Sequence, residues 1–435
     1  MLNDLAPLDP FLNRKNNLTV PAHSLEVMEL CLLDWAICGL GADNNPISLG
    51  MAQYSLNAGA GSASIFNAPT ANDSMWSGRV PARTAALING TMSHALDFDD
   101  THFGHIGHVS TVVIPAALAV AETEGADFDA FLRAARIGAE VATRVGLWLG
   151  RSHYQAGWHQ TATSGAFGAA SAAAILMDAP PTSTILNVAG FASGQKAQFG
   201  SAMKPVNAGM AAAHGVEAAQ LAKVGMCGSP DVIAALLATH HAEGNVSAFA
   251  GLGETWIFDS VSHKYHACCH GTHAMIEALL SLMPLHADTV ERITVRTHPR
   301  WMSVCNKPSP TSWLEGKFSY RFLTALFLDG SRTIDPEPEA YFPLSQATQA
   351  MMARVNVVAD DNVPETASEV IVSLSTGETL RASHDLAEPE PLSLRREKLM
   401  KKGADLLSPG VAQDVADAIA ARNLSALTRA LRRAN

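Results

Sequence analysis

The 435-residue sequence predicts a mainly α protein, in which a large all-helical domain is followed by a smaller α+β domain. First, apolar residues recur at helical spacing up to about residue 250, with no convincing alternating strand. Second, the two-residue period of a strand becomes clear only at 290–297. Third, the composition is 48% hydrophobic but only 16% charged, where about 25% charged is usual. Such a chain can bury a large core of closely packed helices.

The helices of the first domain are expected in chain order. Residues 1–20 should form an irregular arm, and Ser24 is a suitable N-cap for a helix that stops near Gly41. Pro81 suits the first turn of a further helix. Apolar residues over 127–148 give the clearest amphipathic helix. Other helices are expected at 51–57, around Pro115, and at 164–177, 182–192, 207–224 and 230–240.

The α+β domain begins where this pattern changes. A short strand is expected within 255–263, and VERITVRT at 290–297 alternates as a strand does. Two strands, 369–374 and 379–383, flank a turn with Gly377 and should form a hairpin. Helices are expected at 272–282, 318–328, 393–403 and 410–433, and Pro-rich loops at 308–310 and 335–343. The expected domains are 1–262 (helical), 263–392 (an α+β lid) and 393–435, whose helices should pack back on the helical domain.

Charge, cysteine content and hydropathy restrict the function. The formal net charge of −11 argues against a nucleic-acid partner, whose phosphates would be repelled. It does not argue against a small anionic substrate, because a few local cations can reverse the sign of the field. The six cysteines form no CxxC pair and no evident disulfide framework, and no signal peptide is seen, so a cytoplasmic location is expected. No run of about 20 uncharged apolar residues suggests a membrane span.

Residues 89–119 (NGTMSHALDFDDTHFGHIGHVSTVVIPAALA) hold the densest set of titratable side chains. Three carboxylates and three imidazoles precede an apolar run: Asp97, Asp99, Asp100, His102, His105 and His108. Burying such groups is costly unless they are paired, and chains retain them mainly at functional sites. Three interpretations stay open. The residues are metal ligands, although no zinc pattern such as HExxH is present; or helix caps and hydrogen-bonded histidines; or a metal-free acid–base site.

Three further stretches carry candidate residues. GWHQT contains His159 just before a helix, whose first N–H groups suit a carboxylate, although a lone loop histidine is more often incidental. AMKPVNAG contains Lys204, the only cation for several residues on either side, which suits a base or a partner for a substrate carboxylate. HKYHACCHGTH contains Cys268 and Cys269, for which a metal centre or a thiolate nucleophile is disfavoured but open.

These motifs, in this order, resemble the MmgE/PrpD family. The matching segments are NGTMSHALDFDDTH…HVSTVVIPAALA, GWHQTATSGAFGAA, AMKPVNAGMAAAHGVEAAQLA, KYHACCHGTHAMIEAL and FSYRFLTALFLDG. The resemblance implies an active site between helical domain and lid, with no cofactor and no metal, in a homodimer that binds a small anionic polycarboxylate. The catalytic residues it implies are Asp97, His108, His159 and Lys204. The substrate-binding residues it implies are Thr101, His105, Lys264 and Tyr320.

Departures from the family pattern bear on the reaction. Phe322 stands where the FSxxY pattern has a tyrosine, and Cys269 where a histidine is often found. The loop before His108 is one residue longer, which leaves His105 as an alternative to it.

The chemistry shared by the family is proton transfer at a carbon next to a carboxylate. Without the tyrosine hydroxyl, loss of a hydroxyl group or of carbon dioxide is less well supported than simple proton exchange. The function expected first is therefore a cofactor-independent epimerase, an isomerase, acting on a polycarboxylate such as iminodisuccinate. The alternatives are a hydro-lyase resembling 2-methylcitrate dehydratase, a decarboxylase of cis-aconitate type, a zinc enzyme and a non-catalytic helical scaffold.

Overall fold

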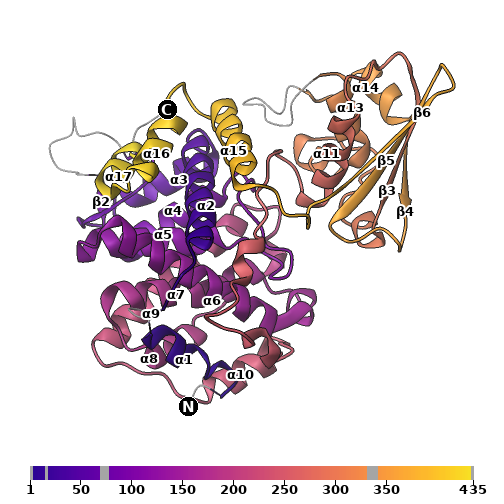
Figure 1. Ribbon diagram of the computed structural model, residues 1–435. Coiled ribbons are helices and arrows are strands. Elements are labelled where there is room, and N and C mark those ends of the chain that lie inside the picture. Colours follow the sequence, from indigo (N-terminus) through magenta and orange to yellow (C-terminus); the bar gives the residue numbers. More distant parts are fainter. Residues whose placement is uncertain (1–2, 15–17, 69–77, 331–340, 433–435) are drawn as a thin grey trace. The chain divides into compact units, whose positions relative to one another are not determined.

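The computed structural model describes residues 3–14, 18–68, 78–330 and 341–432. The chain divides into two compact units (Figure 1). The large unit consists of Met1–His263 together with Leu392–Asn435, and the small unit of Lys264–Pro391. Helices dominate the large unit, whereas the small unit carries a four-stranded sheet. The predicted mainly α fold is confirmed.

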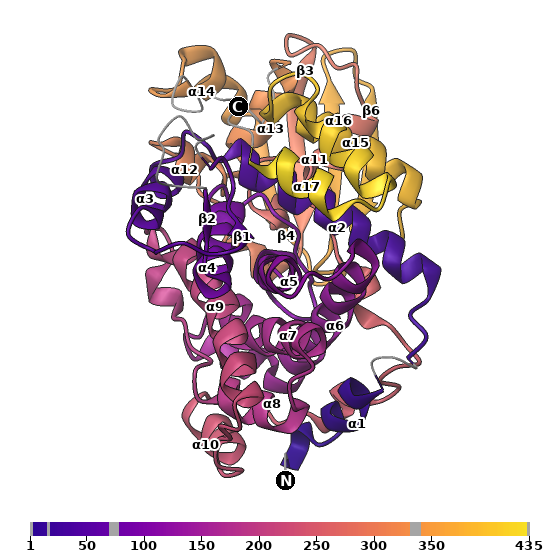
Figure 2. The same ribbon diagram turned by 90° about the vertical axis from the view of Figure 1, so that its left-hand side faces the viewer.

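One helix forms the centre of the large unit. The helices of this unit are α1 (Leu8–Asn13), α2 (Ala22–Gly41), α3 (Pro46–Ser55), α4 (Ala82–His94), α5 (Ser110–Glu124), α6 (Phe128–Gln155), α7 (Gln160–Met177), α8 (Pro181–Ala189), α9 (Met203–Lys223), α10 (Val232–Thr239), α15 (Leu392–Leu406), α16 (Val411–Ala420) and α17 (Leu424–Leu431). Helix α7 packs against α5, α6, α8 and α9, and Figure 2 shows it among them. A Cβ atom on Gly168 of α7 would lie 2.5 Å from the carbonyl oxygen of Gly138 in α6. Glycine at this crossing therefore allows the two helices to meet backbone to backbone.

The ends of the large unit meet at α2. Helices α15 and α16, which follow the small unit in the chain, both pack on α2, and α17 packs on α16. Two short strands, β1 (Ala63–Ser64) and β2 (Arg79–Val80), pair antiparallel near α5. The helix predicted over 127–148 is present as α6, which has Asp127 as its N-cap and continues past a break at Gly150. The C-terminal helices are thus part of the same packed body as the first helices.

The small unit is a sheet in the order β4-β3-β5-β6, partly covered by helices. Its strands are β3 (Val290–Thr297), β4 (Val355–Ala359), β5 (Ala367–Leu374) and β6 (Thr379–Asp385), and its helices are α11 (His273–Ser281), α12 (Trp313–Gly316), α13 (Tyr320–Leu328) and α14 (Gln346–Met352). β3 runs parallel to β4 and antiparallel to β5, and β5 and β6 form the predicted hairpin. Helix α11 packs on β5 and β6, where Val370 and Val372 are buried.

Several local predictions are wrong. Residues 1–20 are not all irregular, since α1 forms within them. Ser24 does not cap α2, which begins at Ala22; its hydroxyl donates to Asp259 instead. No strand forms within 255–263. A 3-10 turn lies there instead, and the backbone of this segment forms only isolated bridges. Part of the expected loop at 335–343 (335–340) lies outside the described residues.

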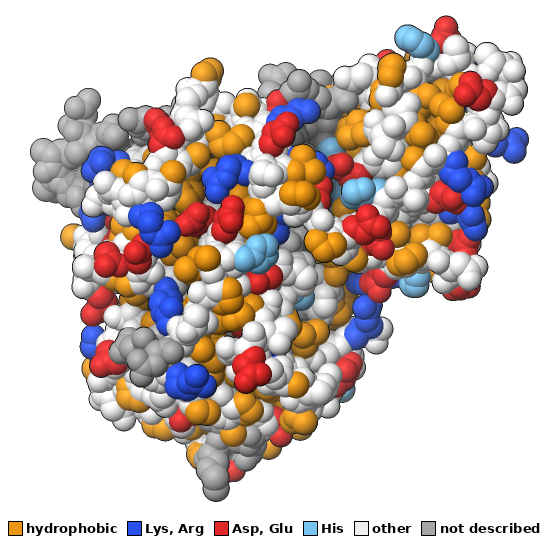
Figure 3. Space-filling model, viewed as in Figure 1, with side chains coloured by type: hydrophobic (Ala, Val, Ile, Leu, Met, Phe, Trp, Pro, Cys, Tyr) orange, Lys and Arg blue, Asp and Glu red, His pale blue; other side chains and the backbone are white. Residues whose placement is uncertain are grey.

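The surface and the hydropathy of the helices add two observations. Figure 3 shows acidic, basic and hydrophobic side chains interspersed over the visible face of the large unit, so surface composition on that face does not mark a site. Among the described residues, no helix has the length and apolar character that crossing a lipid bilayer requires.

Candidate active site

Four segments of the large unit place the candidate catalytic side chains. Helix α4 ends at His94, and α5 begins at Ser110 after a loop. Asp97 in this loop has a left-handed backbone (φ 54°), which is uncommon for a residue with a side chain. His159 occupies the N-cap position of α7, and Lys204 lies in the first turn of α9. Because α4, α5, α7 and α9 pack together, their ends bring these side chains close.

Six side chains form what we call the acid–base cluster: His94, Asp97, Asp99, His108, His159 and Lys204. Asp99 contacts two imidazoles, with His94 Nδ1 2.9 Å from its Oδ1 and His108 Nδ1 3.1 Å from its Oδ2. Asp97 contacts His108 Nε2 through Oδ1 at 3.4 Å, and Lys204 Nζ through Oδ2 at 2.6 Å. A continuous chain of charged contacts therefore runs from His94 to Lys204.

His108 is the central proton-carrying group of this chain by geometry. Each of its ring nitrogens faces a carboxylate, and both can donate only when the ring is protonated. Its side chain is 11% exposed and that of Asp97 38%. The arrangement therefore suits His108 to hold a proton that a small molecule beside Asp97 can exchange.

The charges of Asp99 and His159 follow from their surroundings. Burial alone would raise the pKa of Asp99, but the neighbouring charges of His108 and His94 outweigh it and hold this pKa well below its usual value. Asp99 is thus a fixed negative charge between two imidazoles. For His159, burial lowers the pKa well below its usual value, and the nearby His94 and Lys204 lower it further. His159 is therefore neutral at neutral pH, and it can accept or donate one hydrogen bond per nitrogen.

Two buried ring nitrogens in the cluster have no hydrogen-bond partner among the described residues: His94 Nε2 and His159 Nδ1. The two rings are stacked at 24° with centroids 6.1 Å apart. Phe199 packs edge-on against His159 at 4.9 Å, and Lys204 Nζ lies 5.3 Å from the centre of the Phe199 ring. Buried polar atoms usually have partners, so those of His94 and His159 are suited to a polar ligand.

His159 is held in place by its flanking residues. Its backbone N–H donates to the carbonyl of Gly194 at 2.9 Å. The preceding Trp158 stacks on His240, with ring centroids 3.9 Å apart, and pairs through its backbone with Gln195. The GWH motif therefore fixes the imidazole at the start of α7.

His105 and Thr101 have other surroundings. His105 is fully buried, its Nε2 lies 2.6 Å from Ser164 Oγ, and burial lowers its pKa to about 3. Of the two candidate histidines, His108 is the one that contacts Asp97 and Asp99. Thr101 exchanges backbone hydrogen bonds of 2.9 and 2.8 Å with Ser262, which ties the loop to the end of the large unit.

The other candidates belong to the small unit. Lys264 is 3% exposed. The Tyr320 hydroxyl donates to the carbonyl of Gly271 at 2.8 Å and lies 3.0 Å from Thr297 Oγ1, while burial raises its pKa well above the usual value. Phe322 is buried against Trp313. The predicted roles of Lys264 and Tyr320 in substrate binding stay predictions.

The cysteines of the small unit offer little nucleophilic character. Burial raises the pKa of Cys268 to about 12, so its thiol is protonated at neutral pH. Cys305 Sγ lies 3.4 Å from Cys269 Sγ, and burial raises the pKa of Cys305 well above its usual value. A thiolate mechanism at Cys268 is therefore poorly supported.

Part of the acid–base cluster has a geometry compatible with a metal ion. His94, Asp97, Asp99 and His108 each offer a ligand atom, and these atoms lie within 4.8 Å of one another. Two imidazoles and two carboxylates are suitable ligands for a divalent transition metal. An ion bound there would compete with Lys204 for Asp97, since the ammonium lies 2.6 Å from that carboxylate.

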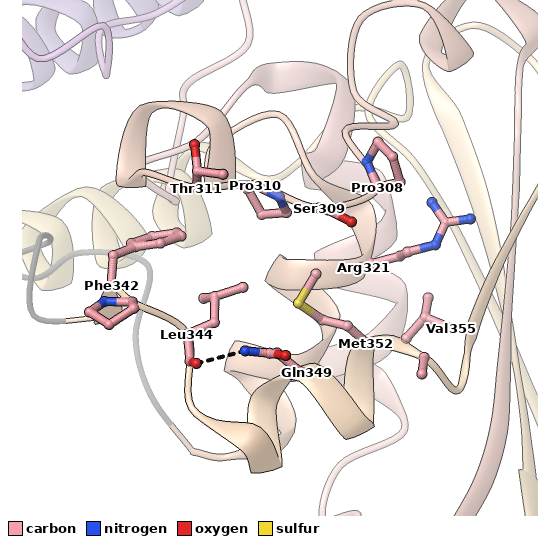
Figure 4. Close-up of a pocket in the computed structure, with 12 residues that line it drawn as sticks. Pro308, Ser309, Pro310, Thr311, Arg321, Phe342, Leu344, Gln349, Met352 and Val355 are labelled. Carbon is pink, nitrogen blue, oxygen red and sulfur yellow. Dashed lines mark hydrogen bonds between the residues drawn. The ribbon is translucent and has the colours of Figure 1, made fainter.

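A separate hollow of about 750 Å³ lies within the small unit (Figure 4). Pro308, Pro310, Leu344 and Met352 contribute apolar walls, and Arg321 is the charged residue among its described lining residues. Because it brings together no acid–base pair, this hollow does not compete with the acid–base cluster as a place for proton transfer.

Sequence reasoning missed the pairing of His94 with Asp99. His94 stands inside the SHALDFDD motif, three residues before Asp97, and is not among the residues that the sequence pattern indicates as candidates. Its position at the last turn of a helix, five residues before Asp99, is a signal that could have indicated the contact.

Comparison with known proteins gives the family. The MmgE/PrpD N-terminal domain matches residues 11–242, and the MmgE/PrpD C-terminal domain matches residues 266–426. Human cis-aconitate decarboxylase is 27% identical over 335 residues, which cover 71% of this chain and 68% of the relative. An Aspergillus oryzae cis-aconitate decarboxylase-like protein, oryM, is 28% identical over 311 residues, 63% of this chain and 62% of the relative. Cis-aconitate decarboxylase of Aspergillus terreus is 26% identical over 277 residues, 56% of each chain.

The human alignment thus spans about two thirds of the relative and the two fungal ones less than that. The two domain matches, by contrast, cover most of this chain; the first lies within the large unit, and the second covers the small unit and continues into the C-terminal helices of the large unit. The chain belongs to the MmgE/PrpD family.

Proposed function

We propose that this protein catalyses proton transfer at a carbon next to a carboxylate of a small polycarboxylate, and that its reaction is a decarboxylation of cis-aconitate or a close analogue. The observation that carries the proposal is the acid–base cluster, in which His108 lies between two carboxylates and one of these, Asp97, also contacts Lys204. The names of the relatives favour decarboxylation over the epimerisation expected from the sequence.

The chemistry fits the groups present. Loss of carbon dioxide from a carboxylate leaves an electron pair, which an adjacent unsaturated carboxylate can take up as an enolate-like anion. Carbon must then be protonated. His108 supplies that proton, and the ammonium of Lys204 stabilises the developing negative charge. Asp99, fixed as an anion, orients His108 through Nδ1.

Substrate carboxylates need partners as well. In the proposal, His159 donates or accepts one hydrogen bond through its buried Nδ1, and Thr101 contributes a further contact. His105 Nε2 is engaged by Ser164 Oγ and the Tyr320 hydroxyl by the Gly271 carbonyl, so these two atoms are not proposed to contact the substrate.

A second candidate is an epimerase, which returns the proton to the opposite face of the carbon. Phe322 favours it, because this buried side chain has no hydroxyl to protonate a leaving group. The nearby Tyr320 hydroxyl is engaged within the small unit. Such a site still needs two acid–base groups, for which His108 and His159 are the proposed pair.

The test is product analysis in deuterated water. The purified protein is incubated with cis-aconitate, 2-methylcitrate and iminodisuccinate in turn, and products are followed by NMR together with carbon dioxide release. Carbon dioxide release with one deuterium in the product supports the decarboxylase. Deuterium at the carbon next to the carboxylate, with inverted configuration and no release of carbon dioxide or water, supports the epimerase, and alkene formation with loss of water supports the hydro-lyase. No turnover of any of them would overturn the proposal.

Matched variants on helix α9 separate the site from the fold. Lys204→Met should abolish the activity found, because Asp97 loses its cation. Lys223→Met, at the other end of the same helix, removes a lysine that is 46% exposed and paired with Glu124. That control should leave turnover unchanged.

A further inference from the structure

A second set of charges lies beneath the loop that carries the acid–base cluster. We call it the buried network: Asp34, His263, Arg395 and Lys402, all in the large unit. Lys402 of α15 is fully buried, and its Nζ lies 2.5 Å from Asp34 Oδ1 of α2. A buried ammonium is costly unless it is paired and hydrogen-bonded. Asp34 supplies the charge, and the pKa of Lys402 is raised despite burial because of it.

Lys402 also holds the backbone of the catalytic loop. Its Nζ donates to the carbonyl oxygen of Phe98 at 2.8 Å and lies 3.8 Å from the centre of the Phe98 ring. Phe98 stands directly between Asp97 and Asp99, the two carboxylates that contact His108. The ammonium of Lys402 therefore holds the carbonyl of the residue that stands between the two aspartates.

The loop needs such a restraint. Asp97 adopts a left-handed backbone, which is unfavourable for a residue with a Cβ atom. Strained conformations persist where the surroundings over-determine them. The Lys402 contact to Phe98 supplies that restraint on one side, and Asp100 supplies it on the other by accepting hydrogen bonds from Ser110 at the start of α5.

The same network reaches both places where the chain leaves and re-enters the large unit. Asp34 Oδ2 lies 3.6 Å from Nδ1 of His263, the last residue before the small unit. Arg395, three residues after the chain returns at Leu392, lies 3.0 Å from His263 Nε2 and donates to the carbonyl of Val261. Lys402 thus belongs to a connected set of polar contacts within the large unit and is not part of an isolated ion pair.

We propose that Lys402 is a positioning residue for the acid–base cluster. Through the Phe98 carbonyl it sets the spacing of Asp97 and Asp99, and so the position of His108 between them. This role rests on the proposed function in one respect only, that His108 carries the transferred proton. In this proposal, the hydrogen bond from Lys402 to the Phe98 carbonyl positions the cluster, and the charge of Lys402 does not.

That distinction makes the proposal testable, because the ion pair and the hydrogen bond can be separated. Asp34→Asn removes the negative charge of the ion pair but keeps the amine of Lys402, which still donates to the Phe98 carbonyl. Lys402→Met combined with Asp34→Asn removes both charges, which restores charge balance in the interior but leaves the Phe98 carbonyl without its donor. If this double variant does not fold, Lys402→Met with Asp34→Leu replaces it, since an apolar pair of similar volume is often tolerated in place of a buried ion pair.

The expected results differ between stability and activity. Asp34→Asn should lower the midpoint of thermal unfolding and keep kcat close to that of the parent. The double variant should be more stable than Lys402→Met alone and yet lose about 100-fold in kcat, the loss that a misplacement of about 1 Å can cause. Equal kcat in parent and double variant would overturn the proposal.

A second readout does not depend on any substrate. In protein labelled with ¹³C-histidine, the His108 signal is assigned from its absence in His108→Gln and followed through a pH titration. The chemical shift of the His108 signal should differ from that of the parent in the double variant and should be unchanged in Asp34→Asn. If no substrate is turned over, a shifted His108 signal still supports the positioning role. An unchanged signal in the double variant refutes it, whatever the reaction.

Discussion

The acid–base cluster and the buried network share one loop, residues 97–100, but differ in solvent access. In the cluster, the side chain of Asp97 is 38% exposed and that of its partner Lys204 16%. In the network, the side chain of Asp34 is 1% exposed and that of Lys402 0%. Both pairs are Lys–Asp contacts with nearly equal separations of 2.6 and 2.5 Å.

Distance alone therefore does not separate a reactive pair from a supporting one. What separates them is solvent access. Both sets contain a buried polar atom without a hydrogen-bond partner among the residues that the structure describes, including His159 Nδ1 and Asp34 Oδ2, but the cluster reaches a partly exposed carboxylate, Asp97, whereas Asp34 is buried. The comparison predicts that substitutions at the accessible residues act directly on activity. Substitutions at the buried residues should change stability or its pH dependence, and should change activity only by displacing the loop.

Replacing His108 with Gln should have the largest effect. Because general acid–base catalysis contributes about 10²–10⁴-fold, kcat should fall by about that factor, while the midpoint of thermal unfolding changes little. The matched control is His105→Gln, which removes a buried ring that is hydrogen-bonded to Ser164. Its main effect should be a lower midpoint of thermal unfolding, with only a small change in kcat. The reverse result, loss of kcat in His105→Gln alone, would exchange the two roles.

Asp100 offers the next largest effect, on the buried side of the same loop. Burial, together with Asp34 and Asp99, raises its pKa to about 7 from the usual 3.8. The folded state therefore binds this proton more tightly than the unfolded state. The stabilisation is complete below about pH 4 and is lost as the pH rises through about 7.

At 1.36 kcal/mol per pKa unit, the loss amounts to about 4 kcal/mol in all, about 3 of it between pH 5 and pH 8. Asp100→Asn cannot ionise, so the free energy of unfolding of the variant minus that of the parent should rise by this amount over the same interval. Urea unfolding at both pH values measures it.

Asp99→Asn should change the pH dependence of stability in the opposite direction. The pKa of Asp99 is held well below its usual value, so its stabilisation is present above about pH 4 and is lost as the pH falls through the lowered pKa. This variant should therefore be least stable, relative to the parent, at neutral pH. Parallel pH profiles for the two variants would contradict the assignment of different surroundings to neighbouring carboxylates.

The sequence was sufficient to predict elements that depend on local pattern. The helix capped by Asp127 and the hairpin around Gly377 are set by periodicity and turn residues within a few positions, and both are present. Strand β4 was missed because it is an edge strand whose partner, β3, precedes it by about 60 residues, so no local signal marks the pairing.

The candidate site divides in the same way. The motifs with Asp97, His108 and Lys204 were predicted, and the structure brings these residues into contact. The support from Lys402 could not be predicted, because 304 residues separate it from Phe98 and a lysine on a charged helix ordinarily faces solvent. Sequence therefore indicated the reactive side of the loop and gave no indication of the buried one.

The smallest expected effect concerns the coupling within the cluster itself. The pKa of His159 is lowered first by burial, and further by His94 and Lys204. Lys204→Met removes one of these cations but leaves the burial, so the pKa of His159 should rise and still remain below its usual value. Titration of ¹³C-labelled histidine measures the change, with Lys223→Met as the control on the same helix. A full return to the usual pKa would mean that the charge of the lysine, and not burial at the start of α7, keeps His159 neutral. The pKa of His159 would then be set by the neighbouring charges alone.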